Sequence, residues 1–411
     1  MMFAAAVERR RLYLALTAIL TVAFVLRLGA RMAYGEDHFW TDGYLAFYRA
    51  AQNLADGNGF CNGTACSRPP IYVAFLALTL FLPKNYLFIV VPQALIGTGT
   101  TLCAFLIGRQ IFSPIAGLIA CALASVYPYY VMHDTALQDT AMYTFACALA
   151  VWLLLRASLH NRPADWLCAG AALGAVVLVR ASLAPVVAAA VLWTTLWGRD
   201  TIRERLRATV LVALAAVVVM SPWLITTYRH TGAPVLSTDA GYMLWVANNP
   251  DTFSRYPVGS IDRSRDVAVS HLTTEDRAEL EALSGDQRAS GAWYARRALD
   301  FMRAQPGWVA QAAWRKIEAG FSWRLSPQRE PLAQLAYALG YVPVALLGLA
   351  GMALAWRKRE TGLIVLMVLA FLAVSAVFLS HTSHRVFLDV YLMVFSASVL
   401  ARLMSPSANA S

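Results

Sequence analysis

The 411-residue chain is 59% hydrophobic and only 14% charged, with a formal net charge of +10. So apolar a composition excludes a soluble globular enzyme and predicts an all-α protein that crosses a membrane many times. The positive charge falls in short arginine clusters between apolar runs, as topology signals do, so we do not expect a nucleic-acid partner.

Ten apolar runs approach or exceed the length of roughly 20 residues that a membrane-spanning helix needs. Arginine and lysine in short loops orient the runs, because these residues stay on the cytoplasmic side. We therefore expect a multi-pass protein of the bacterial inner membrane, with both termini in the cytoplasm. The expected spans are residues 12–30, 86–107, 114–131, 139–155, 166–179, 183–197, 206–227, 332–356, 363–379 and 386–403.

The apolar run 69–82 is short for a span and begins with a pair of prolines. If this run crossed the membrane, every later loop would change sides. The arginine-rich loop 199–207 would then face outward, against the usual distribution of basic residues in membrane proteins. We therefore predict that 69–82 is an interfacial or re-entrant helix on the outer side.

This topology divides the chain into four parts. Residues 1–227 form a module of seven spans that includes a first outer loop at 31–85. Residues 228–331 form an external, mostly helical insertion that is too long for a simple connector. Within it, 274–303 is rich in helix-forming residues, and Thr273 or Thr274 can cap its start. Residues 332–404 hold three more spans, and 405–411 form a cytoplasmic tail.

Charged side chains gather in the predicted outer loops. Such side chains are costly to desolvate at a membrane boundary, so they usually pair with each other or serve a ligand. Carboxylates beside arginines suit a reaction on an anionic lipid head group, in which a carboxylate removes a proton and arginines hold a departing phosphate. The candidates are Asp37, Asp42 and Arg68 in the first loop, His133, Asp134 and Asp139 in the second, and Arg180, Arg229 and Arg385 in or beside later outer turns.

Two of the six cysteines, Cys61 and Cys66, share a polar loop that contains Gly63. Such a loop turns tightly enough to close a small disulfide in an oxidising compartment. The other four cysteines lie in apolar runs, where cysteine acts as a small hydrophobic residue.

Four segments carry a recognisable pattern. They are 41–60, which begins Thr41-Asp-Gly-Tyr, together with 67–76; then 133–140; 174–181; and 221–229 together with 241–250. These segments resemble, in the same order, bacterial class C glycosyltransferases of the family 39 type, which are related to protein O-mannosyltransferases and to the aminoarabinose transferase of lipid A. The resemblance implies a class C helix bundle with juxtamembrane helices on its outer face. It also implies a polyprenyl-phosphate-linked sugar as donor, and transfer on the periplasmic face with inversion at the anomeric carbon.

The same resemblance assigns roles to individual residues. The family's general base is an aspartate in the first outer loop, which falls on Asp42, with Asp37 as the nearest rival. Arg68 falls where the family often has a basic residue that contacts the lipid phosphate. Asp139 stands where relatives commonly have glutamate, and the turn around Arg385 departs from the family's Arg-Tyr pattern.

Structural roles compete with these assignments. Asp42 can cap a helix at 43–54, because an aspartate before such a run accepts hydrogen bonds from free backbone amides. Arg68 can anchor the following proline segment at the membrane interface. Arg180 and Arg229 can be ordinary boundary arginines that serve no head group.

Three polar residues of the second outer loop can bind a divalent cation, because histidine and carboxylate side chains at one helix end can converge on a metal. The alternative is a helix cap with hydrogen bonds to the first outer loop. No other cofactor is assigned, and the lack of a glycine-rich phosphate loop in the sequence argues against a nucleotide-sugar enzyme. The three residues are His133, Asp134 and Asp139.

These observations together predict a membrane glycosyltransferase that moves a sugar from a polyprenyl-phosphate donor to an envelope acceptor, which can be a lipid, a glycan or a protein. Two other classes of function compete with it. A flippase or transporter of lipid-linked sugars would be expected to carry inverted repeats, and we find no internal repeat. A non-catalytic envelope-assembly protein would tolerate replacement of Asp42.

Overall fold

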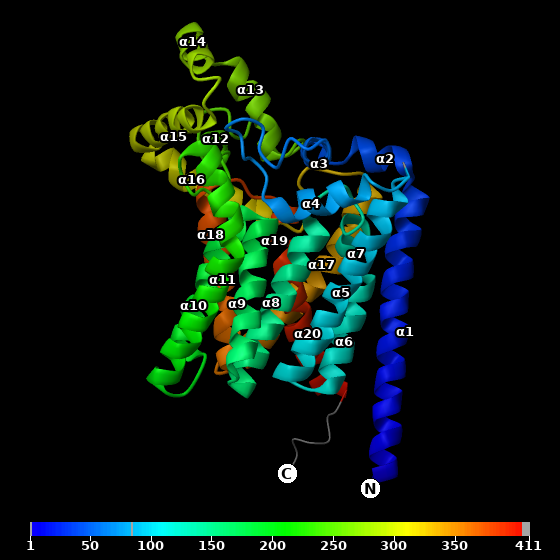
Figure 1. Cartoon of the computed structure of the whole chain (residues 1–411). Coiled ribbons are helices and arrows are strands. Elements are labelled where there is room, and N and C mark those ends of the chain that lie inside the picture. Colours follow the sequence, from blue (N-terminus) through cyan, green and yellow to red (C-terminus); the bar gives the residue numbers. More distant parts are fainter. Residues whose placement is uncertain (1, 84, 405–411) are drawn as a thin grey trace.

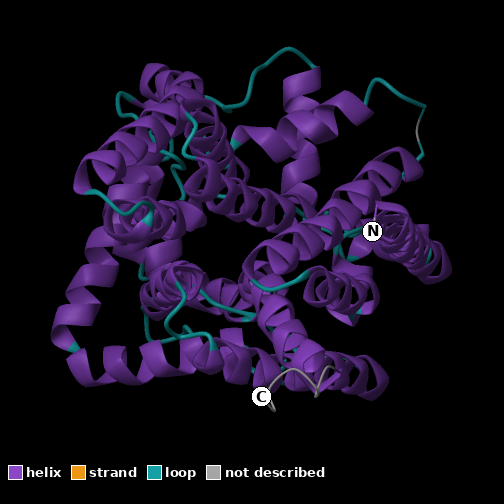
Figure 2. Ribbon diagram, turned by 90° about the horizontal axis from the view of Figure 1, so that it is seen from below, coloured by secondary structure: helices purple, strands orange, loops and turns teal. Residues whose placement is uncertain are grey.

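The computed structural model describes residues 2–83 and 85–404. Within these residues every regular element is a helix, apart from one isolated bridge between Asn62 and Ala65. Long helices stand side by side in a bundle, and shorter helices cover one of its ends (Figure 1). Several helices of the bundle appear end-on when the molecule is seen from below (Figure 2). The predicted all-α, polytopic architecture is therefore confirmed, while the predicted tail 405–411 lies outside the described residues.

Ten helices of the described chain form the bundle, in agreement with the ten expected spans. Seven segments are long and apolar enough to cross a membrane, and three shorter apolar helices stand among them. The seven are α1 (Met2–Tyr34), α5 (Leu87–Ile111), α8 (Thr140–His160), α11 (Ile202–Thr231), α17 (Pro331–Leu354), α18 (Arg359–Val377), and the segment Thr382–Met404 that ends with α20 (Asp389–Met404). The shorter three are α6 (Pro114–Val126), α9 (Pro163–Val179) and α10 (Ala184–Trp197).

The expected span 114–131 is interrupted near its outer end. Helix α6 stops at Val126, and a short helix α7 (Pro128–His133) follows it. Proline has no backbone N–H to donate and disfavours the helical conformation in the residue before it. Tyr127 accordingly adopts an extended conformation, with φ −63° and ψ 117°. The chain therefore enters the second outer loop earlier than the sequence pattern suggests.

The ambiguous run 69–82 forms α4 (Pro70–Thr79), a helix of 10 residues. At a rise of about 1.5 Å per residue such a helix covers only about half of a bilayer core that is roughly 30 Å thick. It lies at the capped end of the bundle and packs against α3 (Leu45–Ala55) and the end of α9 (Figure 1). Its short length and its place at this end agree with an interfacial helix rather than a span.

The remaining short helices form a cap on the same end of the bundle. Two come from the first outer loop, α2 (Glu36–Thr41) and α3, and the others come from the insertion. The expected helix 274–303 is split in two, with Thr273 capping the first half through the backbone N–H of Asp276. The insertion helices are α12 (Ala240–Ala247), α13 (Arg265–Ser270), α14 (Thr274–Ala282), α15 (Gln287–Ala304) and α16 (Pro306–Phe321).

A buried lysine ties the insertion to the bundle. The Lys316 ammonium of α16 donates hydrogen bonds to the carbonyl oxygen of Ala247, the side-chain oxygen of Asn248 and the carbonyl oxygen of Val377. These acceptors lie at the ends of α12 and α18, so one side chain joins three helices. The insertion is therefore docked on the bundle and does not hang from it as a separate body.

Glycines allow two pairs of bundle helices to approach closely. A Cβ added to Gly170 of α9 would lie 2.3 Å from the Val212 carbonyl oxygen of α11, and one added to Gly351 of α17 would lie 2.2 Å from the Phe395 carbonyl oxygen of α20. Association of helices in lipid depends on such close backbone packing, because lipid provides no hydrophobic drive between helices.

We expect the substitution Gly170→Ala to lower the free energy of unfolding by about 1–3 kcal/mol, because the added methyl group overpacks the contact between α9 and α11. Gly362 of α18 is the matched control, since a Cβ there meets no atom within 4 Å. Gly362→Ala should leave stability unchanged or raise it slightly. Thermal unfolding of the two variants in the same detergent measures the difference, and equal midpoints would contradict the packing argument.

Candidate functional site

Residues 134–139, between α7 and α8, form a short loop at the capped end of the bundle, which we call the hub loop. Its side chains and carbonyl groups hold four other segments, namely α1, α5, the first outer loop and the end of α9. Because these segments are far apart in the sequence, the hub loop determines how the candidate site is assembled. The contacts are Asp134 with Arg27, Asp134 and Ala136 with Gln93, Leu137 with Tyr44, and Asp139 with Arg180.

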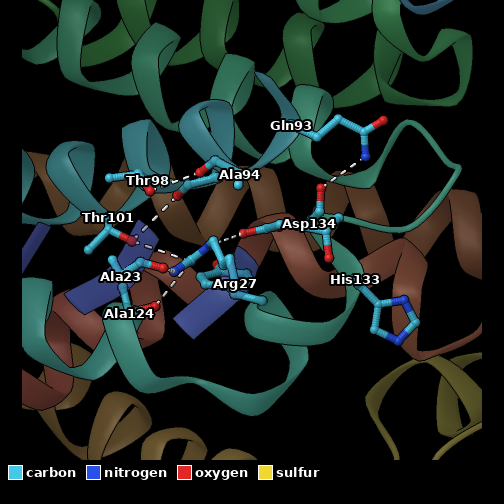
Figure 3. A network of polar contacts seen from close by, with 12 residues as sticks. Ala23, Arg27, Gln93, Ala94, Thr98, Thr101, Ala124, His133 and Asp134 are labelled. Carbon is cyan, nitrogen blue, oxygen red and sulfur yellow. Dashed lines mark hydrogen bonds and ion pairs between the residues drawn. The ribbon is translucent and has the colours of Figure 1, made fainter. Parts of the chain in front are cut away.

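Arg27 and Asp134 form an ion pair inside the protein (Figure 3). The Arg27 Nε lies 2.8 Å from the Asp134 Oδ2, and at most 1% of either side chain is exposed. The other guanidinium nitrogens donate to the carbonyl oxygens of Ala23 and Ala124, at 3.0 and 3.3 Å. A buried charge without a partner costs several kcal/mol, so this pair holds the start of the hub loop against α1.

Helix α5 makes room for the pair and adds hydrogen bonds of its own. A Cβ on Gly97 would lie 2.3 Å from the Asp134 Oδ2, so the carboxylate occupies the space of the missing side chain. The Gln93 amide group donates to the carbonyl oxygens of Asp134 and Ala136, at 3.0 and 2.6 Å, and accepts from the Tyr72 hydroxyl of α4 at 3.0 Å. Three helices thus hold this end of the hub loop.

Asp139 and Arg180 form the second ion pair of the hub loop. The Arg180 Nη1 is 2.9 Å from the Asp139 Oδ1, and the guanidinium lies over the Tyr143 ring, 4.7 Å from its centroid. Burial raises the pKa of Asp139, while the positive charges of Arg180 and Arg68 act to lower it. This bond uses one of the five donors of the guanidinium, so Arg180 retains capacity to bind an anion.

Three polar groups from other segments lie within electrostatic reach of this pair or of one another. They are Tyr44 of the first outer loop, Asp262 of the insertion and His381 of the last outer turn. Among the described residues, the buried Asp262 Oδ1 finds no hydrogen-bond partner. Burial lowers the pKa of His381 to about 4, so this side chain is neutral at pH 7, and its Nδ1 lies 2.7 Å from the Ser383 hydroxyl.

Asp42 lies at the C-terminal end of α2, within electrostatic reach of Arg31. Its carboxylate accepts a hydrogen bond from the Tyr34 hydroxyl at 3.1 Å, lies 3.7 Å from the His38 Nδ1, and is 42% exposed. The helix-cap interpretation is wrong, because α3 begins at Leu45 and no side chain caps it. Between Asp42 and the start of α3, the backbone N–H of Tyr44 donates a hydrogen bond to the Leu137 carbonyl oxygen of the hub loop. The Asp42 carboxylate is therefore open to solvent.

The rival aspartate and two of the predicted arginines have different surroundings. Asp37 is exposed in the first turn of α2, and its carbonyl oxygen accepts a hydrogen bond from the Thr41 hydroxyl. The Arg68 guanidinium lies over the Phe47 ring of α3, 5.1 Å from its centroid, and within electrostatic reach of Asp139. Arg229 is exposed in the last turn of α11, and its role stays a prediction.

The structure places Arg385 inside the protein instead of in the outer site. Its side chain is fully buried, with the Nη2 3.2 Å from the Asp389 Oδ2 and 3.1 Å from the Tyr337 hydroxyl oxygen. The guanidinium also lies over the Tyr341 ring, 3.7 Å from its centroid. The prediction that Arg385 contacts a lipid phosphate is therefore wrong for this structure, because Arg385 is buried in an ion pair with Asp389, one helical turn later.

The three candidate metal ligands of the second loop do not converge. Asp134 faces Arg27 and Asp139 faces Arg180, while the His133 Nδ1 lies 2.8 Å from the Gln138 amide nitrogen. No group of three metal-ligating side chains occurs within residues 2–83 and 85–404. The predicted cation site at these three residues is wrong, because each of the two carboxylates is already paired with an arginine.

Cys61 and Cys66 are joined by a disulfide in a loop beside α3. This loop is held from outside as well. The backbone N–H of Thr238 donates to the Cys66 carbonyl oxygen at 3.2 Å, and the Ser237 hydroxyl donates to the Ser67 carbonyl oxygen at 2.9 Å. The disulfide loop therefore joins the first outer loop to the start of the insertion.

Two residues of the site were not predicted from the sequence. Arg27 lies within the first apolar run, and a charge there is itself a signal, because a charged side chain within a span needs a partner. Asp262 lies in the insertion, where no periodic pattern or family segment marks it. Only the folded chain shows that it approaches Tyr44 and His381.

Comparison with known proteins bears on the fold. The family model for dolichyl-phosphate-mannose-protein mannosyltransferase matches residues 67–225, which is less than half of the chain. No curated protein sequence matches this chain. The oligosaccharyltransferase AglB from Archaeoglobus fulgidus, solved in complex with an inhibitory peptide and a dolichol-phosphate, has a TM-score of 0.57 at 14% identity. That alignment covers 98% of this chain and 52% of the archaeal chain, so this chain spans about half the length of AglB.

The chain has the fold of the class C glycosyltransferases. A second structure of the Archaeoglobus fulgidus oligosaccharyltransferase, tethered to an acceptor peptide, agrees, with a TM-score of 0.54 at 14% identity over 95% of this chain and 50% of that one. ArnT from Cupriavidus metallidurans, bound to undecaprenyl phosphate, has 15% identity over 96% of this chain and 78% of that one, but its TM-score of 0.40 supports no argument. The resemblance seen in the sequence is thus confirmed for the class C fold.

We expect Arg27→Met to destabilise this class C fold by about 3–5 kcal/mol, because the substitution leaves the Asp134 carboxylate buried without its partner. The double variant Arg27→Met with Asp134→Asn removes both charges and should recover part of that loss. Denaturant unfolding of the purified protein in detergent measures both. A single variant as stable as the wild type, or a double variant no better than the single, would contradict the proposed dependence on the pair.

The buried neutral His381 predicts a pH dependence of stability. Between pH 6.5 and about 4 the unfolded chain binds a proton at this residue and the folded protein does not. The free energy of unfolding should therefore fall as the pH falls through this window. Subtracting the unfolding curve of His381→Asn from that of the wild type should isolate this slope. A difference that does not change with pH would show that His381 titrates equally in both states.

Proposed function

We propose that this protein transfers a sugar from a polyprenyl-phosphate donor to an acceptor of the cell envelope, with Asp42 as general base. The observation that carries the proposal is the contrast among the aspartates of the site. Asp134 and Asp139 are each bound to an arginine, whereas the exposed Asp42 carboxylate accepts a hydrogen bond from a neutral hydroxyl. Among the described residues no guanidinium forms an ion pair with Asp42, and the carboxylate is exposed, so an acceptor can reach it, as a general base requires.

The distribution of basic residues supports an outer, periplasmic location for this site. Helices α5 and α10 end, and α9, α11 and α18 begin, at the uncapped end (Figure 1). Basic residues lie at these helix ends, namely Arg109, Arg162, the cluster 199–207 and the cluster 357–359. Because such clusters stay in the cytoplasm, the cap and the hub loop belong on the opposite side of the inner membrane. Helix α1 begins and α20 ends at the uncapped end, so both termini would be cytoplasmic.

Arg180 and Arg68 are the residues best placed to hold the donor phosphate. Both lie within electrostatic reach of Asp139 in the hub loop. A guanidinium binds phosphate oxygens through paired, charge-assisted hydrogen bonds. The dolichol-phosphate in the AglB structure supports a lipid phosphate as part of the ligand. A divalent cation plays no assigned part in this scheme.

The proposed reaction is a direct displacement. The acceptor hydroxyl or amine attacks the anomeric carbon while its proton passes to Asp42. The bond between that carbon and the phosphate oxygen breaks, and the electron pair leaves with the polyprenyl phosphate, whose charge the arginines stabilise. Attack from the side opposite the phosphate inverts the anomeric configuration. The donor supplies the free energy, and no nucleotide is consumed.

We expect Asp42→Asn to lower kcat by about 10²–10⁴-fold, because it removes the proton acceptor, and to change the KM for the donor little. The assay supplies a defined polyprenyl-phosphate sugar with candidate envelope acceptors and identifies the product by mass. Asp37→Asn is the matched control on the same helix and should retain transfer.

Other functions predict a different outcome for the same variants. Transport of lipid-linked sugars or a scaffolding role has no need for a proton acceptor, so either would survive the loss of Asp42. A folded Asp42→Asn protein with full transfer activity would remove Asp42 as the base. Loss of transfer in Asp37→Asn alone would assign the role to its rival.

A further inference from the structure

A groove of about 410 Å³ opens on the cap between α3 and the disulfide loop. Its volume lies within the range of roughly 300–1,000 Å³ typical of small-molecule sites. Alanine side chains on α3 keep it open, and charged or amide side chains line much of its wall. The polar lining residues are Arg49 and Asn53 of α3, Asn62, Ser67 and Arg68 of the disulfide loop and its continuation, and Asp239 before α12.

The walls of the groove are held rigidly. The Asn53 amide nitrogen donates to the Gly59 carbonyl oxygen at 2.9 Å, which ties the end of α3 to the chain that leads into the disulfide loop. The disulfide closes that loop, and the start of the insertion binds it on the other side. Phe60 packs edge to face against Trp223 of α11, with 6.0 Å between the ring centroids. A preformed wall lowers the entropic cost of binding a ligand.

Positive charge is in excess inside the groove. Arg49 and Arg68 contribute two guanidinium groups, and Asp239 contributes one carboxylate. Burial raises the pKa of Asp239, while Arg68 and a hydrogen bond with Ser67 act to lower it. Neither arginine is in an ion pair with a described carboxylate, as Arg180 is with Asp139. An anionic ligand would therefore meet at least one uncompensated guanidinium.

Apolar and polar groups share the wall of the groove. Ala46, Ala50 and Phe60 offer apolar surface, and the amide and charged side chains offer hydrogen bonds. Amides and a carboxylate suit sugar hydroxyls, because each offers donors or acceptors to a neutral polar group. A guanidinium pairs with a carboxylate or phosphate in a bidentate geometry. Hydroxyl groups together with an acidic substituent are the chemistry of an acidic sugar.

We propose that this groove binds the acceptor as an acidic carbohydrate, a sugar that carries a carboxylate or a phosphate. The inference rests on the proposed function, which it deepens by naming the acceptor class. Arg68 lines the groove and also lies within electrostatic reach of Asp139, so this arginine links the groove to the hub loop. Arg49 binds the acidic substituent further along α3, and a hydroxyl of the sugar faces the reaction centre.

The test is equilibrium binding to the full-length protein in detergent, which needs no catalysis. The probes are galacturonate for a carboxylate, glucose 6-phosphate for a phosphate, and galactose as the neutral sugar. We expect either acidic sugar, or both, to bind at least about tenfold more tightly than galactose, because a charge-assisted hydrogen bond adds that much. The preferred probe then distinguishes a carboxylate acceptor from a phosphorylated one.

Two groove variants and one matched control identify the site. Arg49→Ala should reduce the affinity for the acidic probe about tenfold, and Asn62→Ala should weaken all sugars. Arg303 is the control, because it is exposed at the end of α15 and outside the groove. Arg303→Ala should bind like the wild type. Thermal unfolding in the same detergent confirms that each variant is folded.

Each result decides the proposal separately from the proposed function. Equal binding of acidic and neutral sugars, no binding of any sugar, or full binding by a folded Arg49→Ala protein would overturn the groove assignment even where transfer is active. Acidic-sugar binding that depends on Arg49 supports the assignment even in the absence of transfer, in which case only the transferase proposal fails. In an active enzyme, Arg49→Ala should raise the KM for the acceptor and leave that for the donor unchanged.

Discussion

An arginine in the first span and an aspartate at the start of an outer loop meet inside the protein, and the candidate site depends on that contact. Arg27 and Asp134 are separated by 107 residues in the chain and by 2.8 Å in space. The pair holds the hub loop, whose later residues position the first outer loop and Arg180. The geometry of the candidate site therefore depends on a buried ion pair. Removing one partner of such a pair lowers the stability of the fold strongly, because the other charge stays buried without a counter-charge.

The three aspartates of the candidate site differ in the groups that surround their carboxylates. Asp134 is structural, since its charge is matched by Arg27 and it sits against Gly97. Asp139 orients a guanidinium that can also bind an anion. Asp42 is open to solvent and accepts a hydrogen bond from the Tyr34 hydroxyl, which is why we propose it as the general base. The proposed transferase function rests on these differences in surroundings among the three aspartates.

Much of the architecture was predictable because hydropathy and arginine placement report directly on lipid burial and topology. The ten bundle helices and the short helix α4 follow from those two signals. Pairing of distant side chains leaves no such signal. The sequence pattern suggested Asp134 and Asp139 as metal ligands, because it does not show that Arg27 and Arg180 pair with them. Arg385 looked like an outer arginine, but Asp389 lies one turn later on the same side and draws it inward.

The central claim is that a lipid phosphate binds among the arginines of the hub loop with its sugar facing Asp42. An experimental structure of the protein with a non-hydrolysable polyprenyl-phosphate sugar tests it most directly. The account predicts phosphate oxygens within hydrogen-bond distance of Arg180 or Arg68, and the anomeric carbon on the side of the Asp42 carboxylate. A phosphate bound at the uncapped end, or a sugar turned away from Asp42, would contradict it.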